Sequence, residues 1–255
     1  MLSTSGSPQL SYVAEGKGPL VIMLHGLLMD GKSWRNNGLI SLFSPFFHVV
    51  CPDLLGHGES EKQPVPELYT QKNQALSIVK IMDELGYEKA HVIGYSSGAW
   101  VALGLLNHHP ERLHSVVLGE WDLKNGLPET PEGKLNFDMF MFYAASTAPE
   151  LTSGVSLDNK ESVKCFFNEL RKYSGKKEAS FPYKSPILLW SGASDPYNLP
   201  MAEIAQKYGL SMTLGKGDHL SEFNKPDEAS INEIFKFIET QEGSMSSFTF
   251  HENIN

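Results

Sequence analysis

The chain has 255 residues, of which 41% are hydrophobic and 20% charged, a size and composition that suit one large α/β domain with an insertion. Its formal net charge of -9, with no Lys/Arg cluster to offset it, argues against nucleic acid and anionic membranes as partners. Two cysteines are too few for a disulfide framework, no apolar run is long enough to span a membrane, and the first residues lack the pattern of a signal peptide. We therefore expect a cytoplasmic protein.

Short apolar runs alternate with amphipathic segments along most of the chain. The runs at residues 20–24, 46–51, 91–93, 115–118, 187–190 and 211–214 predict strands, and residues 9–14 predict an edge strand. Helices are predicted over residues 70–85, 199–208 and 227–240, after the strand at 91–93, and in a segment carrying Trp34 and residues 39–43. This alternation predicts an α/β fold with a mostly parallel, doubly wound sheet and helices on both faces.

The alternation pauses between residues 123 and 183. No strand-like run occurs there, and the segment carries two helical stretches, residues 135–145 and one that opens with Asp158 and Glu161 spaced like a capping box and stops near Gly175. We interpret residues 123–183 as a helical cap inserted into a core made of residues 1–122 and 184–242, with a flexible tail at residues 243–255. In open α/β sheets ligands bind at the carboxyl ends of the strands, which is where such a cap would lie.

Residues 90–104, AHVIGYSSGAWVALG, are typical of a strand, a tight turn and a helix. The turn carries Gly94-x-Ser96-x-Gly98, in which the glycines let the strand and the helix approach closely while the serine hydroxyl projects outward. Three fixed positions out of five also arise by chance, but the flanking strand and helix favour a nucleophile elbow. We therefore expect Ser96 to be a nucleophile. The backbone N–H of Ser97, at the positive end of the helix, is expected to be an oxyanion donor.

A serine nucleophile needs a base within hydrogen-bond reach, and the base needs an acid that orients it. After an elbow of this type the acid precedes the histidine in the chain. His219, in a turn after the strand at 211–214, is the expected base, and Asp195, after the strand at 187–190, is the expected acid. Glu120 and Asp122 also follow a strand and stay open as alternative acids, whereas Asp218 is expected to hold its own loop.

The second oxyanion donor is expected in the loop after the strand at 20–24, which reads His25-Gly26-Leu27. Gly26 allows the backbone to approach closely, so the N–H of Leu27 is the expected donor. His25 is expected to be a hydrogen-bonded structural residue of this loop.

Several motifs occur in an order that resembles the α/β-hydrolase fold proteins over residues 9–240. They are His25-Gly26, Asp53-x-x-Gly56-x-Gly58-x-Ser60, Gly94-x-Ser96-x-Gly98, Asp195 and Gly217-Asp218-His219. The chain is most similar to the small, capped, serine esterase-like members of that superfamily. The resemblance implies a Ser96–Asp195–His219 triad with Leu27 and Ser97 as oxyanion donors.

The elbow residue narrows the chemistry that the resemblance implies. Haloalkane dehalogenases and epoxide hydrolases have a similar sheet and cap but carry Asp at the elbow, so Ser96 favours acyl transfer and an esterase. Lactonases, perhydrolases and carbon–carbon bond hydrolases share the serine and remain alternatives, although the last often have an aromatic residue where this chain has Leu220. A ligand receptor or scaffold with little turnover is an alternative of another class.

The substrate is expected to be a small to medium, largely apolar ester or a lactone. The apolar segment at residues 137–143 contributes Phe137 and Met141, and Trp121 and Leu220 lie near the expected site. Packing of the cap onto the core is the alternative role for most of this segment. The sequence has no H-E-x-x-H, no Cys/His cluster, no G-x-G-x-x-G and no P-loop, so no metal and no cofactor are expected. We expect a monomer or a homodimer.

Overall fold

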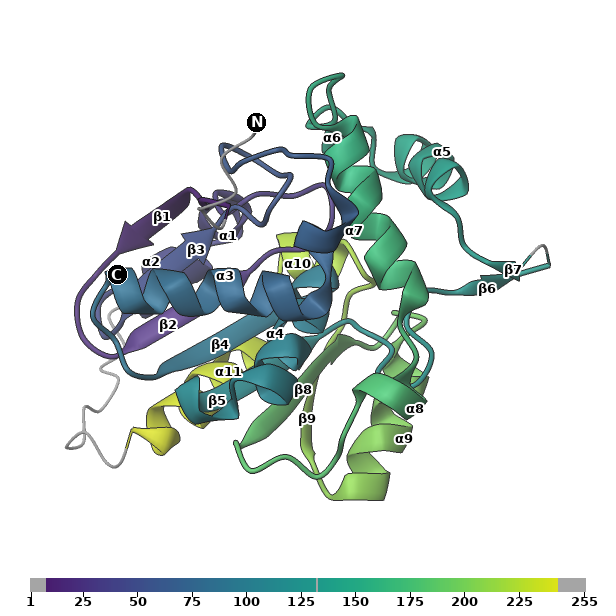
Figure 1. Cartoon of the computed structure of the whole chain (residues 1–255). Helices are drawn as coiled ribbons and strands as arrows, with labels where there is room; N and C mark the ends of the chain where they lie inside the picture. The colour runs from purple at the N-terminus through teal and green to yellow at the C-terminus, as the bar shows by residue number, and fades with distance from the viewer. Residues whose placement is uncertain (1–7, 132, 243–255) are drawn as a thin grey trace, which may run out of the picture.

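The structure is a computed structural model that describes residues 8–131 and 133–242. The flexible tail expected at residues 243–255 lies outside this part of the chain. Seven strands form one sheet in the order β1-β3-β2-β4-β5-β8-β9, in which β1 is antiparallel to β3 and every other pair is parallel (Figure 1). The strands are β1 (Tyr12–Glu15), β2 (Leu20–Leu24), β3 (His48–Pro52), β4 (Ala90–Tyr95), β5 (Leu113–Gly119), β8 (Ile187–Gly192) and β9 (Ser211–Gly215). The predicted α/β class and mostly parallel sheet are confirmed.

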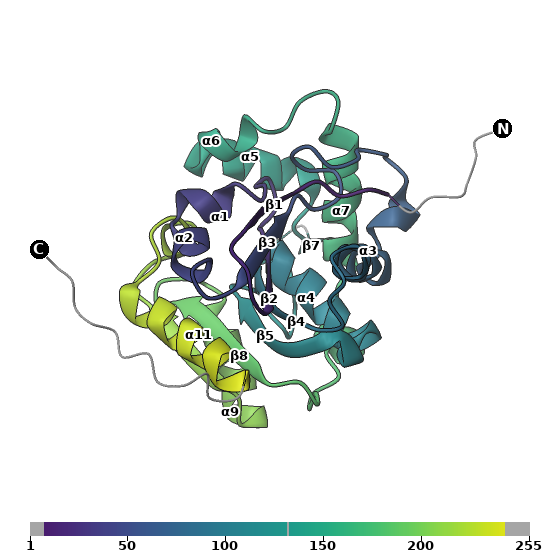
Figure 2. The same cartoon turned by 90° about the vertical axis from the view of Figure 1, so that its left-hand side faces the viewer.

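Helices cover both faces of the sheet. In Figure 2 the helices α1 (Ser33–Asn36), α2 (Leu39–Phe43) and α11 (Glu228–Gln241) lie on one side of the strands. The helices α3 (Gln71–Glu84) and α4 (Ser97–His108) lie on the other side. Helix α9 (Asn198–Tyr208) packs beside β8 and β9, and the remaining core helices are short: α10 (Ser221–Asn224) and the 3-10 turns η1 (Pro66–Tyr69) and η2 (Pro110–Arg112).

Alternate residues of each central strand point to opposite faces and build two hydrophobic cores. On β2, Ile22 belongs to the core shared with α3 and α4, whereas Val21 and Met23 belong to the core shared with α2 and α11. All five β2 residues are buried because both faces are covered. This explains why strands of this sheet appear in the sequence as continuous apolar runs and not as alternating patterns.

The structure differs from the sequence prediction in the first helical segment, which is two helices and not one. The chain breaks after α1, and Gly38 takes a left-handed conformation (φ 85°) directly before α2. Glycine adopts this conformation without the steric penalty that a Cβ brings. Helix α10 was not predicted either, since four residues are too few to show helical periodicity.

The inserted segment between β5 and β8 contains helices and one small hairpin. Its elements are β6 (Glu129–Thr130), β7 (Gly133–Lys134), α5 (Phe137–Thr147), α6 (Pro149–Thr152), α7 (Lys160–Lys172) and α8 (Gly175–Glu178). Helices α5, α6 and α7 lie together beside the sheet, and the β6–β7 hairpin projects from them (Figure 1). The expectation of no strand here was therefore wrong for these four residues.

The capping box predicted for the second helix of this segment does not form. The residue before α7 is Asn159, not Asp158, and no side chain caps the helix. The amide of Asn159 instead accepts a hydrogen bond from Ser156 N–H (2.8 Å) and donates one to Gly154 O (2.9 Å). Asparagine side chains readily satisfy nearby backbone groups in this way, so the loop before α7 is held by Asn159.

Candidate active site

Ser96 lies at the sharp turn between β4 and α4 and has φ +55°, a strained value for a residue with a side chain. The two flanking glycines are required by close packing. A Cβ on Gly94 would lie 2.4 Å from Gly98 O, and one on Gly98 would lie 2.1 Å from Leu24 O. Any larger residue would therefore push α4 away from the strands. The turn has the geometry of a nucleophile elbow.

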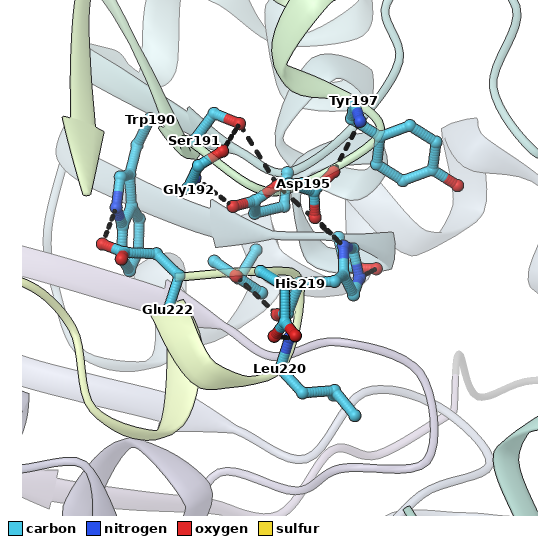
Figure 3. A network of polar contacts seen from close by, with 12 residues as sticks. Trp190, Ser191, Gly192, Asp195, Tyr197, His219, Leu220 and Glu222 are labelled. Atoms are coloured by element: carbon cyan, nitrogen blue, oxygen red, sulfur yellow. Dashed lines mark hydrogen bonds and ion pairs between the residues drawn. The ribbon is translucent and has the colours of Figure 1, made fainter. Parts of the chain in front are cut away.

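The loops after β8 and β9 bring an acid and a histidine to Ser96. His219 Nε2 is 3.0 Å from Ser96 Oγ. His219 Nδ1 is 2.7 Å from Asp195 Oδ2 (Figure 3). A carboxylate accepts hydrogen bonds, so the contact assigns the proton to Nδ1 and leaves Nε2 free to accept from the serine hydroxyl. Three residues far apart in the sequence thus form one hydrogen-bonded chain.

Two tyrosines that the sequence analysis did not single out support the hydrogen-bonded arrangement of Ser96, His219 and Asp195. The backbone N–H of Tyr197 donates to Asp195 Oδ1, and the Tyr95 hydroxyl donates to His219 O at 2.8 Å. The ring of Tyr197 packs edge-on against the His219 imidazole, with 5.6 Å between the ring centroids. Tyr95 directly precedes Ser96, so its place at the strand end was the available signal in the sequence.

Glu222 organises the loop that carries His219. It is 1% exposed and accepts a hydrogen bond from Trp190 Nε1 at 2.9 Å (Figure 3). It also accepts from Gly217 N–H (3.2 Å) and Ser230 Oγ (2.9 Å). A buried carboxylate needs such donors to offset its desolvation. No motif in the sequence marks Glu222, because its partners come from three separate segments.

The alternative acids lie in different environments. Asp122 accepts from Lys124 N–H (2.8 Å) and Asn125 N–H (3.0 Å), so it closes a local turn. Asp218 accepts from the N–H and the hydroxyl of Ser221, which is the loop-holding role expected of it. Glu120 lies beside the triad, with Oε2 4.0 Å from His219 Nδ1. Asp195 is therefore the carboxylate in direct contact with His219.

The loop after β2 lies against Ser96. The position that a Cβ on Gly26 would occupy is 3.4 Å from Ser96 Cβ, so the backbone passes close to the candidate nucleophile. His25 fixes this loop, because its Nδ1 is 2.7 Å from Gly26 O and its Nε2 accepts from Leu54 N–H at 2.9 Å. Burial lowers the pKa of His25 to about 4, so the ring is neutral, as a structural residue requires. The assignment of the Leu27 and Ser97 N–H groups as oxyanion donors stays a prediction.

The four residues expected to contact substrate have different surroundings. Trp121 is buried edge-on against Tyr173, and Phe137 is buried edge-on against Phe167 within the inserted segment. Met141 and Leu220 are partly buried, Met141 against the core on the α3–α4 face and Leu220 against the core on the α11 face. Their contact with substrate remains a prediction.

A cavity of about 410 Å³ lies between the strand-end loops and the inserted segment. Its lining includes Leu28, Met29 and His57 from the core and Leu151 and Val155 from the insertion. Met29 Sδ would lie 3.2 Å from a Cβ on Gly26, so one wall of the cavity is continuous with the loop beside Ser96. The polar residues Asp30, Lys62 and Glu150 also border it, and none of the four predicted contact residues does.

The donor atoms of Glu120, Asp195 and His219 lie within 4.8 Å of one another and are the one group in the described residues that could hold a metal ion. Both ring nitrogens of His219 already make hydrogen bonds, to Ser96 and to Asp195. A metal ligated there by His219 would have to replace one of them. Among the described residues, no helix is long and apolar enough to cross a membrane.

Comparison with known proteins agrees with this fold. The model of the alpha/beta hydrolase fold family matches residues 19–120. Epoxide hydrolase 3 of Siraitia grosvenorii is 32% identical over 116 residues. The matched segment is 46% of this chain and 36% of that protein, so the match spans about a third of the relative's length.

Solved structures match along nearly the whole chain. The enol-lactonase from Burkholderia xenovorans LB400 has a TM-score of 0.73 at 21% identity and covers 90% of this chain and 96% of its own. A thermophilic esterase from Thermogutta terrifontis has a TM-score of 0.73 at 19% identity, covering 94% of this chain and 96% of its own. At such identities the likeness shows the fold. The family match over residues 19–120 and these solved structures agree that the chain has the alpha/beta hydrolase fold.

Proposed function

We propose that the protein is a serine hydrolase that cleaves a carboxylic ester through an acyl-enzyme intermediate. The observation that carries this proposal is the continuous chain from Ser96 Oγ through both nitrogens of His219 to Asp195, with distances of 3.0 and 2.7 Å. A nucleophile, a base and an orienting acid in hydrogen-bond contact form the arrangement that activates a serine hydroxyl.

The reaction follows from the positions of the protons. Ser96 Oγ attacks the ester carbonyl while its proton passes to His219 Nε2, and Asp195 stabilises the imidazolium that forms. The N–H groups of Leu27 and Ser97 receive the oxyanion, and each such donor contributes on the order of 3 kcal/mol to the transition state. His219 then gives its proton to the leaving alcohol. A water molecule activated by the same histidine releases the acid.

The serine at the elbow supports acyl chemistry over epoxide opening. The curated relative named above is an epoxide hydrolase, but the match covers 46% of this chain, and the elbow residue here is Ser96. A lactone is a cyclic ester, so the same three side chains could open it, and linear and cyclic esters both belong in the substrate panel. We infer that the insertion acts as a cap and that one substituent of the ester enters the cavity bordered by Met29 and Leu151.

The decisive experiment is intact-mass labelling with a fluorophosphonate on the wild type, Ser96→Ala and Ser146→Ala. Ser146 is an exposed serine on α5 and serves as the matched control. One adduct on the wild type and on Ser146→Ala, and none on Ser96→Ala, is the expected result. Turnover of a panel of p-nitrophenyl esters and lactones then identifies the ester class.

An unlabelled wild type would contradict the proposed activity and favour the receptor or scaffold interpretation. A wild type that labels once but turns over no ester or lactone in the panel would support an activated serine while rejecting simple ester hydrolysis.

A further inference from the structure

Glu120 is a fully buried carboxyl group beside the triad. It follows β5 directly, its side chain is 0% exposed, and its backbone has φ +50°. A non-glycine residue at positive φ is uncommon and costs free energy, so its surroundings must hold it in place. Backbone strain of this kind is common at functional sites, where contacts with surrounding residues hold it in place.

Its two oxygens face hydrogen-bond donors from the end of β8 and the acid of the triad. Gly192 N–H donates to Glu120 Oε1, and the Ser191 hydroxyl donates to Oε2 at 3.3 Å. One carboxyl oxygen of Glu120 and one of Asp195 lie within 4.8 Å of each other. Like charges so close in a buried site disfavour ionisation of both groups, and a hydrogen bond between them needs a proton on one, because a carboxylate has no hydrogen to donate.

The surroundings decide which of the two carries it. Asp195 accepts from His219 Nδ1–H and Tyr197 N–H, and these bonds, with the one from Glu120, hold its pKa below the usual range although burial alone would raise it. Burial raises the pKa of Glu120 to about 10, with the adjacent Asp195 adding to the effect. Tyr95 and Tyr197, whose pKa values burial raises, also face Glu120 and stay neutral. The proton therefore resides on Glu120.

We infer that Glu120 is a positioning residue whose protonated carboxyl donates a hydrogen bond to Asp195 and holds that carboxylate, ionised, against His219 Nδ1. This inference rests on the proposed function for its catalytic consequence. The proton of Glu120 stays on Glu120 throughout the cycle. The protons that move are those that His219 Nε2 takes first from Ser96 Oγ and later from water, and that it passes to the leaving alcohol and back to Ser96 Oγ.

The first test compares the pKa of His219 in the wild type with that in Glu120→Gln. NMR titration of the imidazole ring measures both values. The resonance among the nine histidines is assigned from its loss in His219→Ala. A neutral Glu120 contributes no charge, and the side-chain amide in Glu120→Gln can also donate to Asp195. We therefore expect the His219 pKa in this variant to stay close to the wild-type value. An ionised Glu120 only 4.0 Å away would instead make the pKa fall by about 1–3 units on substitution. That fall would overturn the inference.

The second test is the rescue of activity. Glu120→Leu removes the donor to Asp195, and we expect kcat for ester hydrolysis to fall at least about tenfold, the scale on which misplacing a catalytic group acts. Glu120→Gln supplies an N–H in the same place and is expected to recover most of that loss, with the acid limb of kcat/KM unmoved. Equal loss of kcat in both variants would overturn the inference.

The two proposals fail in distinguishable ways. A wild type without fluorophosphonate labelling defeats the proposed function, yet the NMR titration still reads the charge of Glu120 without turnover. A wild type that labels, combined with a shifted His219 pKa in Glu120→Gln, defeats the inference alone.

Discussion

At the scale of single residues, the candidate site depends on close backbone packing around Ser96. Gly98 has no room for a Cβ, since Leu24 O lies 2.1 Å from the position it would take. Gly154 offers a control, because its nearest neighbour would be 3.6 Å from an added Cβ. The difference between these glycines is visible only in three dimensions, although the G-x-S-x-G pattern correctly marks the first.

We predict that Gly98→Ala lowers the free energy of unfolding by about 1–3 kcal/mol or more, the usual cost of overpacking a core. The same change should slow fluorophosphonate labelling, because it displaces α4 and the Ser97 N–H. Urea unfolding of Gly98→Ala and Gly154→Ala measures this. A Gly98→Ala variant as stable as Gly154→Ala would contradict the close approach seen here.

The assignment of the acid is also testable by single substitutions. Asp195→Asn removes the acceptor that holds the proton on His219 Nδ1, and we expect kcat to fall by about 10⁴, as in comparable triads. Asp122→Asn alters only a turn, since Asp122 accepts from Lys124 and Asn125, and should cost much less than tenfold. Steady-state ester hydrolysis by both variants makes the comparison. A comparable loss in Asp122→Asn would return that residue to the catalytic candidates.

At the scale of elements, α7 joins the inserted segment to the core. Phe166 is fully buried, with ring centroids 5.5 Å from His57 and 5.8 Å from Trp100. The apolar helix α5 behaves differently, because Phe142 is 78% exposed. Hydrophobicity all round a helix predicts burial, and here that expectation was wrong for Phe142.

We predict that Phe166→Ala lowers the free energy of unfolding by about 3–5 kcal/mol, the range for deleting a buried phenyl ring. Phe142→Ala on α5 is the matched control and should change it by less than about 0.5 kcal/mol, as at other exposed sites. Thermal and urea unfolding of the two variants test this. Similar stability losses would mean that α5 is covered in solution.

At the scale of the whole molecule, the Glu120–Asp195 pair links stability to pH. Burial raises the pKa of Glu120 from an ordinary 4.5 to about 10, so between these values the folded protein holds a proton that the unfolded chain has lost. The stabilisation from that proton is complete below about pH 4.5 and is lost as pH rises toward 10. Asp195, whose pKa is lowered, is ionised in both states above its ordinary pKa and adds no slope there.

Between pH 6 and 9, we therefore predict that wild type loses stability relative to Glu120→Gln by about 1.4 kcal/mol per pH unit, the value for one proton. Other titrating groups are common to both proteins and cancel in the difference. Urea unfolding at four pH values provides the measurement. Parallel stability curves would mean that Glu120 is ionised in the folded state.

Local chemistry in the sequence determined much of the fold and of the candidate site. The apolar run at residues 20–24 matches β2, since a strand covered on both faces must be apolar throughout. Gly94-x-Ser96-x-Gly98 located the elbow, because the close approach of strand and helix admits only glycine at its two ends. The order of Ser96, Asp195 and His219 predicted three side chains that the structure brings into contact.

Only the tertiary structure decided how the two acids differ. Glu120 and Asp195 are both acidic residues after strands, and the sequence left Glu120 open as an alternative acid. The folded chain places Asp195 2.7 Å from His219 Nδ1 and leaves Glu120 at 4.0 Å, buried against Gly192 and Ser191. Burial and hydrogen-bond partners from distant segments set the charge of a carboxyl group. Those partners meet only when β5 and β8 pair, so the protonation of Glu120 is a property of the fold.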